Sequence, residues 1–165
     1  RQHPLEILRQ AAAAIAYMHD RRFMHLDVKA ENFLVNTDDD QLAVKLTDFD
    51  LSRDCRDCRD KHRSGTASYM APEQLTGGHI GVQSDIFAFG VMAYYVVTGR
   101  KPFSGFTIEE MRRQQVSDSF QVSPPIKHNP DLTPKLSWLI LRCLEKDPVK
   151  RIPSMAYLHG ELRKV

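Results

Sequence analysis

Residues 25–32 read HLDVKAEN, a polar stretch with short apolar runs on both sides. The run at 23–25 leads into it, and the runs at 33–35 and 44–47 follow, with polar residues 36–40 between them. Short apolar runs separated by turn-forming residues predict small strands. We therefore expect the last two runs to form a small β-hairpin that carries the polar stretch.

The side chains in and after this stretch suit phosphoryl transfer. Asp27 can accept a proton from an attacking hydroxyl, and Lys29 can face a phosphoryl group. Asn32, together with Asp48 at the end of the last run, offers the hard oxygen ligands that Mg²⁺ prefers. His25 taken alone is more often a hydrogen-bonded core residue than a catalyst, so we assign it no chemistry.

Most of the remaining sequence has the apolar spacing of helices. One helix is predicted from Pro4 to about residue 22, and another after Thr133. The nearly unbroken apolar run at 86–97 predicts a buried helix that Ser84 or Asp85 can cap. Two further helices are predicted to begin at a capping box formed by Thr107 with Glu110 and near Ser154.

The composition fits one soluble domain. The chain has 165 residues and 42% hydrophobic residues, enough for a single core. About five helices against two or three strands indicate a mainly α (α+β) fold, a helical bundle around a buried central helix. Lys and Arg outnumber Asp and Glu by 23 to 21, and a net charge of +2 is too small to predict a nucleic-acid partner.

The sequence also predicts the compartment. The apolar run at 86–97 is too short to span a bilayer, so no membrane segment is expected. Three cysteines, an odd number, favour a reducing compartment, and we expect an intracellular, cytoplasmic protein. Cys55 and Cys58 have C-x-x-C spacing without a second cysteine pair, which disfavours a metal or redox site there. They lie in an aperiodic, charged stretch, residues 50–65, that predicts an exposed loop.

These motifs together resemble the C-terminal lobe of a eukaryotic-type protein kinase of the Ser/Thr class. Residues 25–32 match the family's catalytic loop, residues 48–50 its metal-binding triplet, and residues 71–73 the end of its activation segment. The motifs occur in the family order, and the resemblance extends over nearly the whole chain. It implies that residues 1–165 are the C-terminal lobe of a protein kinase domain.

The resemblance implies roles in catalysis and nucleotide binding. Asp27 is the expected catalytic base, and Lys29 is expected to steady the γ-phosphate. Asn32 and Asp48 are expected to bind Mg²⁺, and with Lys29 and Leu34 they are expected to face the nucleotide. An apolar column beneath the adenine is expected from Leu34, Met92 and Val96.

The resemblance also implies residues that contact substrate or support the site. Thr66 and Glu31 are the expected substrate contacts. Asp85 is expected either to cap the central helix or to hold the backbone of the catalytic loop, and Glu73 to form a buried ion pair with Arg151. The expected structural supports are His25, Phe49, Glu73, Asp85 and Arg151.

The implied function is transfer of the γ-phosphoryl group of ATP to Ser or Thr of a protein substrate, with ATP and Mg²⁺ as cofactors. Two alternatives stay open. One is a pseudokinase, a partner-binding kinase remnant without turnover. The other is a small-molecule phosphotransferase of the aminoglycoside type, suggested by Asp50 in place of the family's usual glycine. Lys29, the segment 65–73 and the helix at Asp85 favour the protein kinase over the small-molecule enzyme.

Two further departures from the family pattern matter. Leu26 stands where many protein kinases carry arginine, and leucine cannot pair with a phosphate on the activation segment. The sequence also contains no Gly-rich loop, strand lysine or helix glutamate of the family's ATP site, so we expect the N-terminal lobe to lie outside this chain. Because phosphoryl transfer depends mostly on positioning, this fragment alone is expected to turn over ATP near background.

Overall fold

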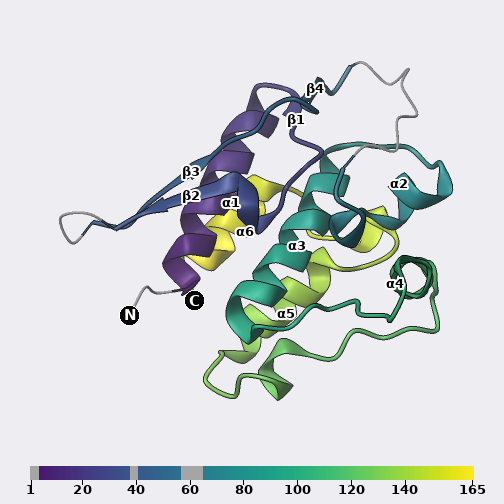
Figure 1. Cartoon of the computed structure of the whole chain (residues 1–165). Helices are drawn as coiled ribbons and strands as arrows, with labels where there is room; N and C mark the ends of the chain where they lie inside the picture. The colour runs from purple at the N-terminus through teal and green to yellow at the C-terminus, as the bar shows by residue number, and fades with distance from the viewer. Residues whose placement is uncertain (1–3, 38–40, 57–64) are drawn as a thin grey trace.

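The buried helix α3 (Val82–Thr98) forms the centre of the domain, and the other helices surround it (Figure 1). In this computed structural model, which describes residues 4–37, 41–56 and 65–165, twelve of the seventeen residues of α3 are buried. A helix that is apolar on most of its faces is stable only when neighbours cover it on several sides. Here α1 (Pro4–Asp20) and α5 (Pro134–Cys143) provide that cover.

Three shorter helices complete the bundle. α6 (Met155–Leu162) packs along α1, while α2 (Pro72–Thr76) and α4 (Ile108–Val116) contact each other at one edge. The predicted starts of α4, α5 and α6 are confirmed. α2 was not predicted, because five residues are too few to show a helical period. Each of the three predicted starts has a hydroxyl N-cap that accepts a backbone hydrogen bond: Thr107, Thr133 and Ser154.

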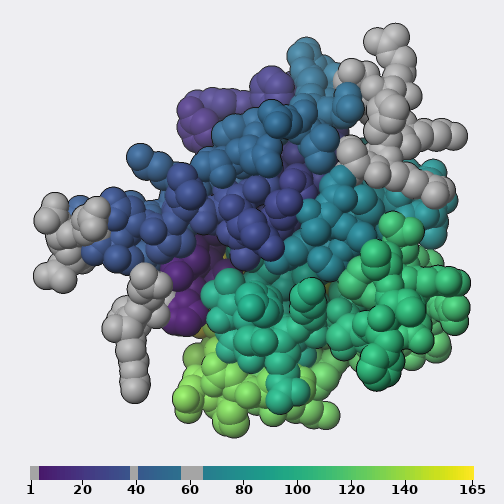
Figure 2. All heavy atoms as spheres, in the orientation of Figure 1, coloured from purple at the N-terminus to yellow at the C-terminus, as the bar shows by residue number. Residues whose placement is uncertain are grey.

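Two antiparallel strand pairs border residues 25–32, hereafter loop 25–32. β1 (Phe23–Met24) precedes it and pairs with β4 (Arg53–Asp54), whereas β2 (Phe33–Asn36) follows it and pairs with β3 (Ala43–Leu46). The predicted hairpin is therefore confirmed as β2 and β3, which project from the helices on the left of Figures 1 and 2. β4 corrects the prediction of an irregular loop after residue 50, and residues 57–64 of that loop lie outside the described residues.

The start of α3 also differs from the prediction. The N-cap is Gly81, with an extended backbone, and not Ser84 or Asp85. Asp85 therefore lies in the first turn of the helix, where its carboxylate is available to groups outside the helix. The mainly α prediction is confirmed, since the described residues form six α-helices and two small strand pairs. None of these described helices is long and apolar enough to cross a membrane.

The central helix approaches α5 closely at Gly90. A Cβ atom added to Gly90 would lie 2.7 Å from Cβ of Cys143 and 3.1 Å from a methyl carbon of Leu144. Side-chain carbons do not pack at the first distance, so this helix contact requires glycine. Cys143 is fully buried, which raises the pKa of its thiol to about 12 and makes it a packing residue.

Replacing Gly90→Ala should lower the free energy of unfolding by about 1–3 kcal/mol, because the added methyl group overpacks the contact between α3 and α5. Gly160 in α6 provides a matched control, since an added Cβ atom there meets nothing within 4 Å. Gly160→Ala should stabilise the protein by up to about 1 kcal/mol through helix propensity. Urea unfolding measures both changes, and equal stabilities of the two variants would contradict the packing argument.

Candidate active site

Loop 25–32 is fixed to the core by its buried side chains. Val28 is buried in the apolar core, as is Phe33 at the start of β2, whereas Asp27 remains partly exposed. His25 is fully buried, and its Nδ1 accepts a hydrogen bond from the amide of Asp27 at 3.2 Å. A ring nitrogen that accepts carries no proton, so Nε2 carries it and donates to the carbonyl of Thr47 at 3.0 Å. The ring thereby joins the loop to the residue that follows β3.

The carboxylate of Asp85, in the first turn of α3, holds the backbone of the same loop. It accepts hydrogen bonds from the amides of His25 and Leu26, both at 2.8 Å. Nε2 of His19 in α1 lies 2.8 Å from the same carboxylate. Asp85 is fully buried, and a buried carboxylate without such partners costs several kcal/mol. The three contacts tie α1, α3 and the loop to one point.

The backbone at Leu26 depends on this restraint. Leu26 has a left-handed conformation (φ 64°), which costs a non-glycine residue roughly 1–2 kcal/mol. Gly65 lies against the same peptide, since a Cβ atom added to Gly65 would be 3.0 Å from the Leu26 carbonyl oxygen. Gly65 itself has φ 129°, which favours glycine. The segment 65–73 therefore begins in close contact with the loop.

Three of the predicted site residues, Lys29, Asn32 and Thr66, contact the carboxylate of a fourth, Asp27. Oδ1 accepts hydrogen bonds from the hydroxyl (3.1 Å) and amide (3.3 Å) of Thr66. Oδ2 lies 3.3 Å from Nζ of Lys29 and 3.2 Å from Nδ2 of Asn32. Lys29 also donates to the Thr66 hydroxyl at 3.0 Å. Loop 25–32 and the segment 65–73 are thus joined by one charged, hydrogen-bonded cluster.

The pKa of Asp27 lies below its ordinary value of 3.8. Partial burial alone would raise the pKa, but hydrogen bonds from Lys29, Asn32 and Thr66 and the positive charge of Lys29 together outweigh burial. Asp27 is therefore ionised at neutral pH. In that state its oxygens accept hydrogen bonds and cannot donate them.

Asn32 and Asp48 provide oxygen atoms that fit a divalent cation. The amide nitrogen of Asn32 donates to the Asp27 carbonyl at 2.7 Å, which leaves the amide oxygen as the free ligand atom. Asp48 is exposed two residues after the end of β3, with a left-handed backbone (φ 60°). Asp50 does not have a positive φ, so aspartate causes no backbone strain where the family carries glycine. Within the described ranges, no three His, Cys, Asp or Glu side chains gather as a metal site, and Cys58 lies outside those ranges.

The other predicted contact residues surround the loop. Leu34 on β2 is 59% exposed, and Phe49 is 52% exposed, with its ring edge-on to His25 at a centroid distance of 5.5 Å. Glu31 is exposed and lies near Tyr69, whose pKa is raised by burial and then by the charge of Glu31. Two residues predicted to accompany Leu34 belong to α3, the buried Met92 and the half-buried Val96.

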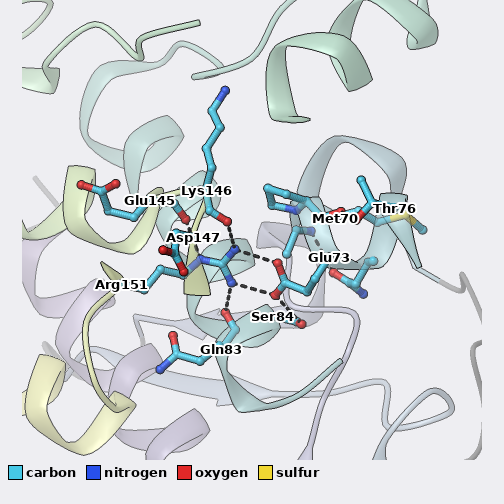
Figure 3. Close-up of polar contacts among 12 residues, drawn as sticks. Met70, Glu73, Thr76, Gln83, Ser84, Glu145, Lys146, Asp147 and Arg151 are labelled. Atoms are coloured by element: carbon cyan, nitrogen blue, oxygen red, sulfur yellow. Dashed lines mark hydrogen bonds and ion pairs between the residues drawn. The ribbon is translucent and has the colours of Figure 1, made fainter. Parts of the chain in front are cut away.

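A buried ion pair holds the far end of the segment 65–73 (Figure 3). Nη1 and Nη2 of Arg151 donate to the two carboxylate oxygens of Glu73, each at 2.7 Å. The expected buried pair is therefore present, and every N–H of the guanidinium has an acceptor. The partners besides Glu73 are the carbonyls of Gln83, Glu145 and Lys146, while the Ser84 hydroxyl donates to Glu73.

A mainly α lobe with this loop, this charged cluster and this ion pair has the architecture of a protein kinase C-terminal lobe. The family described as "Protein kinase domain" matches residues 2–162, and the chain belongs to that family.

Curated relatives agree with the family. The chain is 30% identical over 166 aligned positions to serine/threonine-protein kinase PknB of Mycolicibacterium smegmatis, covering 98% of the chain and 26% of that protein. It is 29% identical to PknB of Mycobacterium leprae (99% and 26% covered). It is 31% identical to a Clostridium acetobutylicum protein named "Probable serine/threonine-protein kinase" (94% and 23% covered). The chain spans about a quarter of the length of these relatives.

Sequence reasoning missed residues that hold the site from other elements. His19 contacts Asp85 from 66 positions away, and a single histidine in a helix gives no local signal for such a contact. Gln115 in α4 was also missed, although it is fully buried and donates to the segment 65–73. A polar residue in an otherwise exposed helix is indistinguishable from a surface residue until the helix is placed.

Replacing Glu73→Gln should lower the free energy of unfolding by about 3–5 kcal/mol, because the buried guanidinium of Arg151 loses its counter-charge. Glu109→Gln is the matched control. Glu109 pairs with Arg113 at 3.0 Å, but both side chains are more than two-thirds exposed, and such pairs contribute less than about 1 kcal/mol. Denaturant unfolding of both variants measures the difference, and similar losses would contradict the assignment of Glu73 to a buried pair.

The lowered pKa of Asp27 predicts a pH dependence. The contacts of the ionised Asp27 contribute fully to the free energy of unfolding when the pH is above the ordinary pKa of 3.8. This contribution is lost as the pH falls through the lower pKa of the folded state. Titration of the Asp27 carboxyl carbon by NMR should give a midpoint below 3.8. Lys29→Met should move that midpoint upward, whereas Lys45→Met on exposed β3 should not. A midpoint insensitive to Lys29→Met would refute the assigned cause.

Proposed function

We propose that the protein transfers the γ-phosphoryl group of ATP to serine or threonine of a protein substrate. In this proposal residues 1–165 supply the catalytic and substrate-binding half of the kinase domain. The supporting observation is the contact of Asp27 with both Lys29 and Thr66, which joins a candidate base, a candidate phosphate-binding cation and the segment 65–73. The names of the bacterial relatives support the same activity.

Asp27 is the proposed group that receives the substrate hydroxyl. Its lowered pKa makes it a weak base, so it first orients the hydroxyl by accepting a hydrogen bond. It takes the proton late, when the new bond to phosphorus makes the hydroxyl acidic. Its ionised state at neutral pH keeps both carboxylate oxygens available for this role.

Lys29 and Thr66 position the reacting groups in this scheme. The ammonium group of Lys29 lies between Asp27 and the Thr66 hydroxyl, where it can offset negative charge on the transferred phosphoryl group. Thr66 fixes the Asp27 carboxylate and presents the start of the segment 65–73 to the substrate. Glu31, exposed near Tyr69, is the proposed contact for a basic substrate residue.

ATP and Mg²⁺ are the proposed cofactors. Asn32 and Asp48 would hold the metal through the amide oxygen and the exposed carboxylate, and bound Mg²⁺ neutralises phosphate charge. Exposed Leu34 is the proposed apolar contact for the adenine, supported by Met92 and Val96. We assign His25, Phe49 and Asp85 to support of this arrangement.

The same proposal extends to partner and compartment. An N-terminal lobe with the Gly-rich loop and strand lysine, motifs that these 165 residues do not contain, is the proposed partner in ATP binding. An intracellular, reducing location is proposed from the cysteine content, since the chain has three cysteines, an odd number.

In the complete protein, Asp27→Asn should lower kcat/KM for phosphorylation of myelin basic protein by about 10²–10⁴-fold, because the base that takes the hydroxyl proton is lost. Asp20→Asn is the control, since this carboxylate is exposed at the end of α1 and should leave the rate unchanged. Mg·ATP-dependent incorporation of radiolabelled phosphate measures both.

Two results would replace the proposal by an alternative. Equal incorporation by wild type and Asp27→Asn, both at background, would favour a pseudokinase. Phosphorylation of an aminoglycoside but of no protein acceptor would favour the small-molecule phosphotransferase.

A further inference from the structure

Helix α4 is attached to the domain mainly through polar contacts. Gln115 is its one buried residue, and Ile108 and Val116 are 61% and 37% exposed. Met111 packs partly against the core. Figure 2 shows this green part of the chain at the edge of the molecule. Apolar burial alone therefore does little to fix α4 against its neighbours.

Gln115 joins α4 to the segment 65–73. Its Nε2 donates to the carbonyls of Ala67 and Met70, each at 3.0 Å. These carbonyls belong to the first residue of the 3₁₀ turn Ala67–Tyr69 and to the residue directly after it. One side-chain amide thus spans the turn from end to end. The two acceptors also fix the orientation of the amide, because the reverse orientation would place oxygen against oxygen.

The turn lies directly beside the charged cluster in the chain. It follows Thr66, whose carbonyl accepts a hydrogen bond from the amide of Tyr69 at 2.9 Å. The hydroxyl and amide of Thr66 donate to Asp27. A continuous path of contacts therefore runs from Gln115 through the turn and Thr66 to the Asp27 carboxylate.

The side-chain oxygen of Gln115 argues against a role in packing alone. Oε1 of Gln115 is buried and accepts no hydrogen bond from any residue in the described ranges. A buried acceptor without a donor is unfavourable, and a methionine of similar length would fill the same volume without it. The favourable contribution of the amide is therefore its two donated hydrogen bonds.

A second polar contact holds the end of α4 from which Gln115 projects. The ammonium group of Lys146 donates to the carbonyls of Gln114 and Ser117. The carbonyl of Lys146 in turn accepts from Arg151, the partner of Glu73. The end of α4 is thereby tied to the ion pair that holds the far end of the segment 65–73.

We infer that Gln115 is a positioning residue for the protein substrate: it holds the turn 67–69 so that Thr66 and the adjoining surface keep their place beside Asp27. This inference rests on the proposed kinase function. The contacts of Asp27 with Lys29 and Asn32 do not involve α4, so loss of Gln115 leaves the nucleotide-facing groups in place.

The kinetic test compares Gln115→Met with Gln114→Met in the complete protein, using myelin basic protein as the acceptor. The side chain of Gln114 bonds to the backbone of Ser104 and not to the turn, which makes it a matched control. Gln115→Met should raise KM for the acceptor about tenfold and leave kcat and KM for Mg·ATP within about twofold. A fall in kcat with both KM values unchanged indicates only a smaller folded fraction and would overturn the inference.

A second measurement does not depend on activity. Hydrogen exchange of the Tyr69 and Met70 amides should be at least about fivefold faster in Gln115→Met, with no change in α3 and none in Gln114→Met. Unchanged exchange in Gln115→Met overturns the inference. If the wild-type protein is inactive but exchange is faster in Gln115→Met as expected, the proposed function is wrong, whereas the contact between α4 and the turn is confirmed. If Gln115→Met does not fold, Gln115→Asn is measured in the same way, because its shorter side chain cannot reach both carbonyls.

Discussion

The carboxylate of Asp85, on the central helix, is fully buried, and the hydrogen bonds that it accepts hold the site in place. A buried carboxylate must receive hydrogen bonds, and Asp85 receives them from the backbone amides of His25 and Leu26, with His19 in contact. This requirement fixes the loop to α3, the buried central helix of the domain. It also stabilises the left-handed backbone of Leu26, against which Gly65 packs.

The segment 65–73 is held in a similar way at three places. Thr66 is bonded to Asp27 at its start, and Glu73 is paired with buried Arg151 at its end. Gln115 contacts the turn between them from α4. Because phosphoryl transfer gains most of its rate from positioning and charge stabilisation, fixed polar contacts around flexible chain segments suit the proposed chemistry. The fold supplies rigidity, and the loops supply the reactive groups.

The elements that were predicted correctly depend on local patterns. The helix that starts at Pro4, the helices capped by Thr107, Thr133 and Ser154, and the hairpin of β2 and β3 all follow from neighbouring residues. The errors occurred where the local pattern was short or ambiguous. β4 has two residues and exists because β1 pairs with it, and α2 has five residues. The start of α3 was misplaced because Ser84 and Asp85 resemble N-caps in sequence.

The candidate chemistry can be identified from local sequence, since Asp27, Lys29 and Asn32 lie within six consecutive residues of a motif that resembles the protein kinase family. Several of the groups that hold these residues in place can be recognised only in the folded chain. Asp85 could cap a helix or bind a loop, and packing selected the loop. The contacts of His19 and Gln115 join residues 45 to 66 positions apart. No local pattern encodes such pairs, because a buried donor finds its acceptor only when the helices are packed.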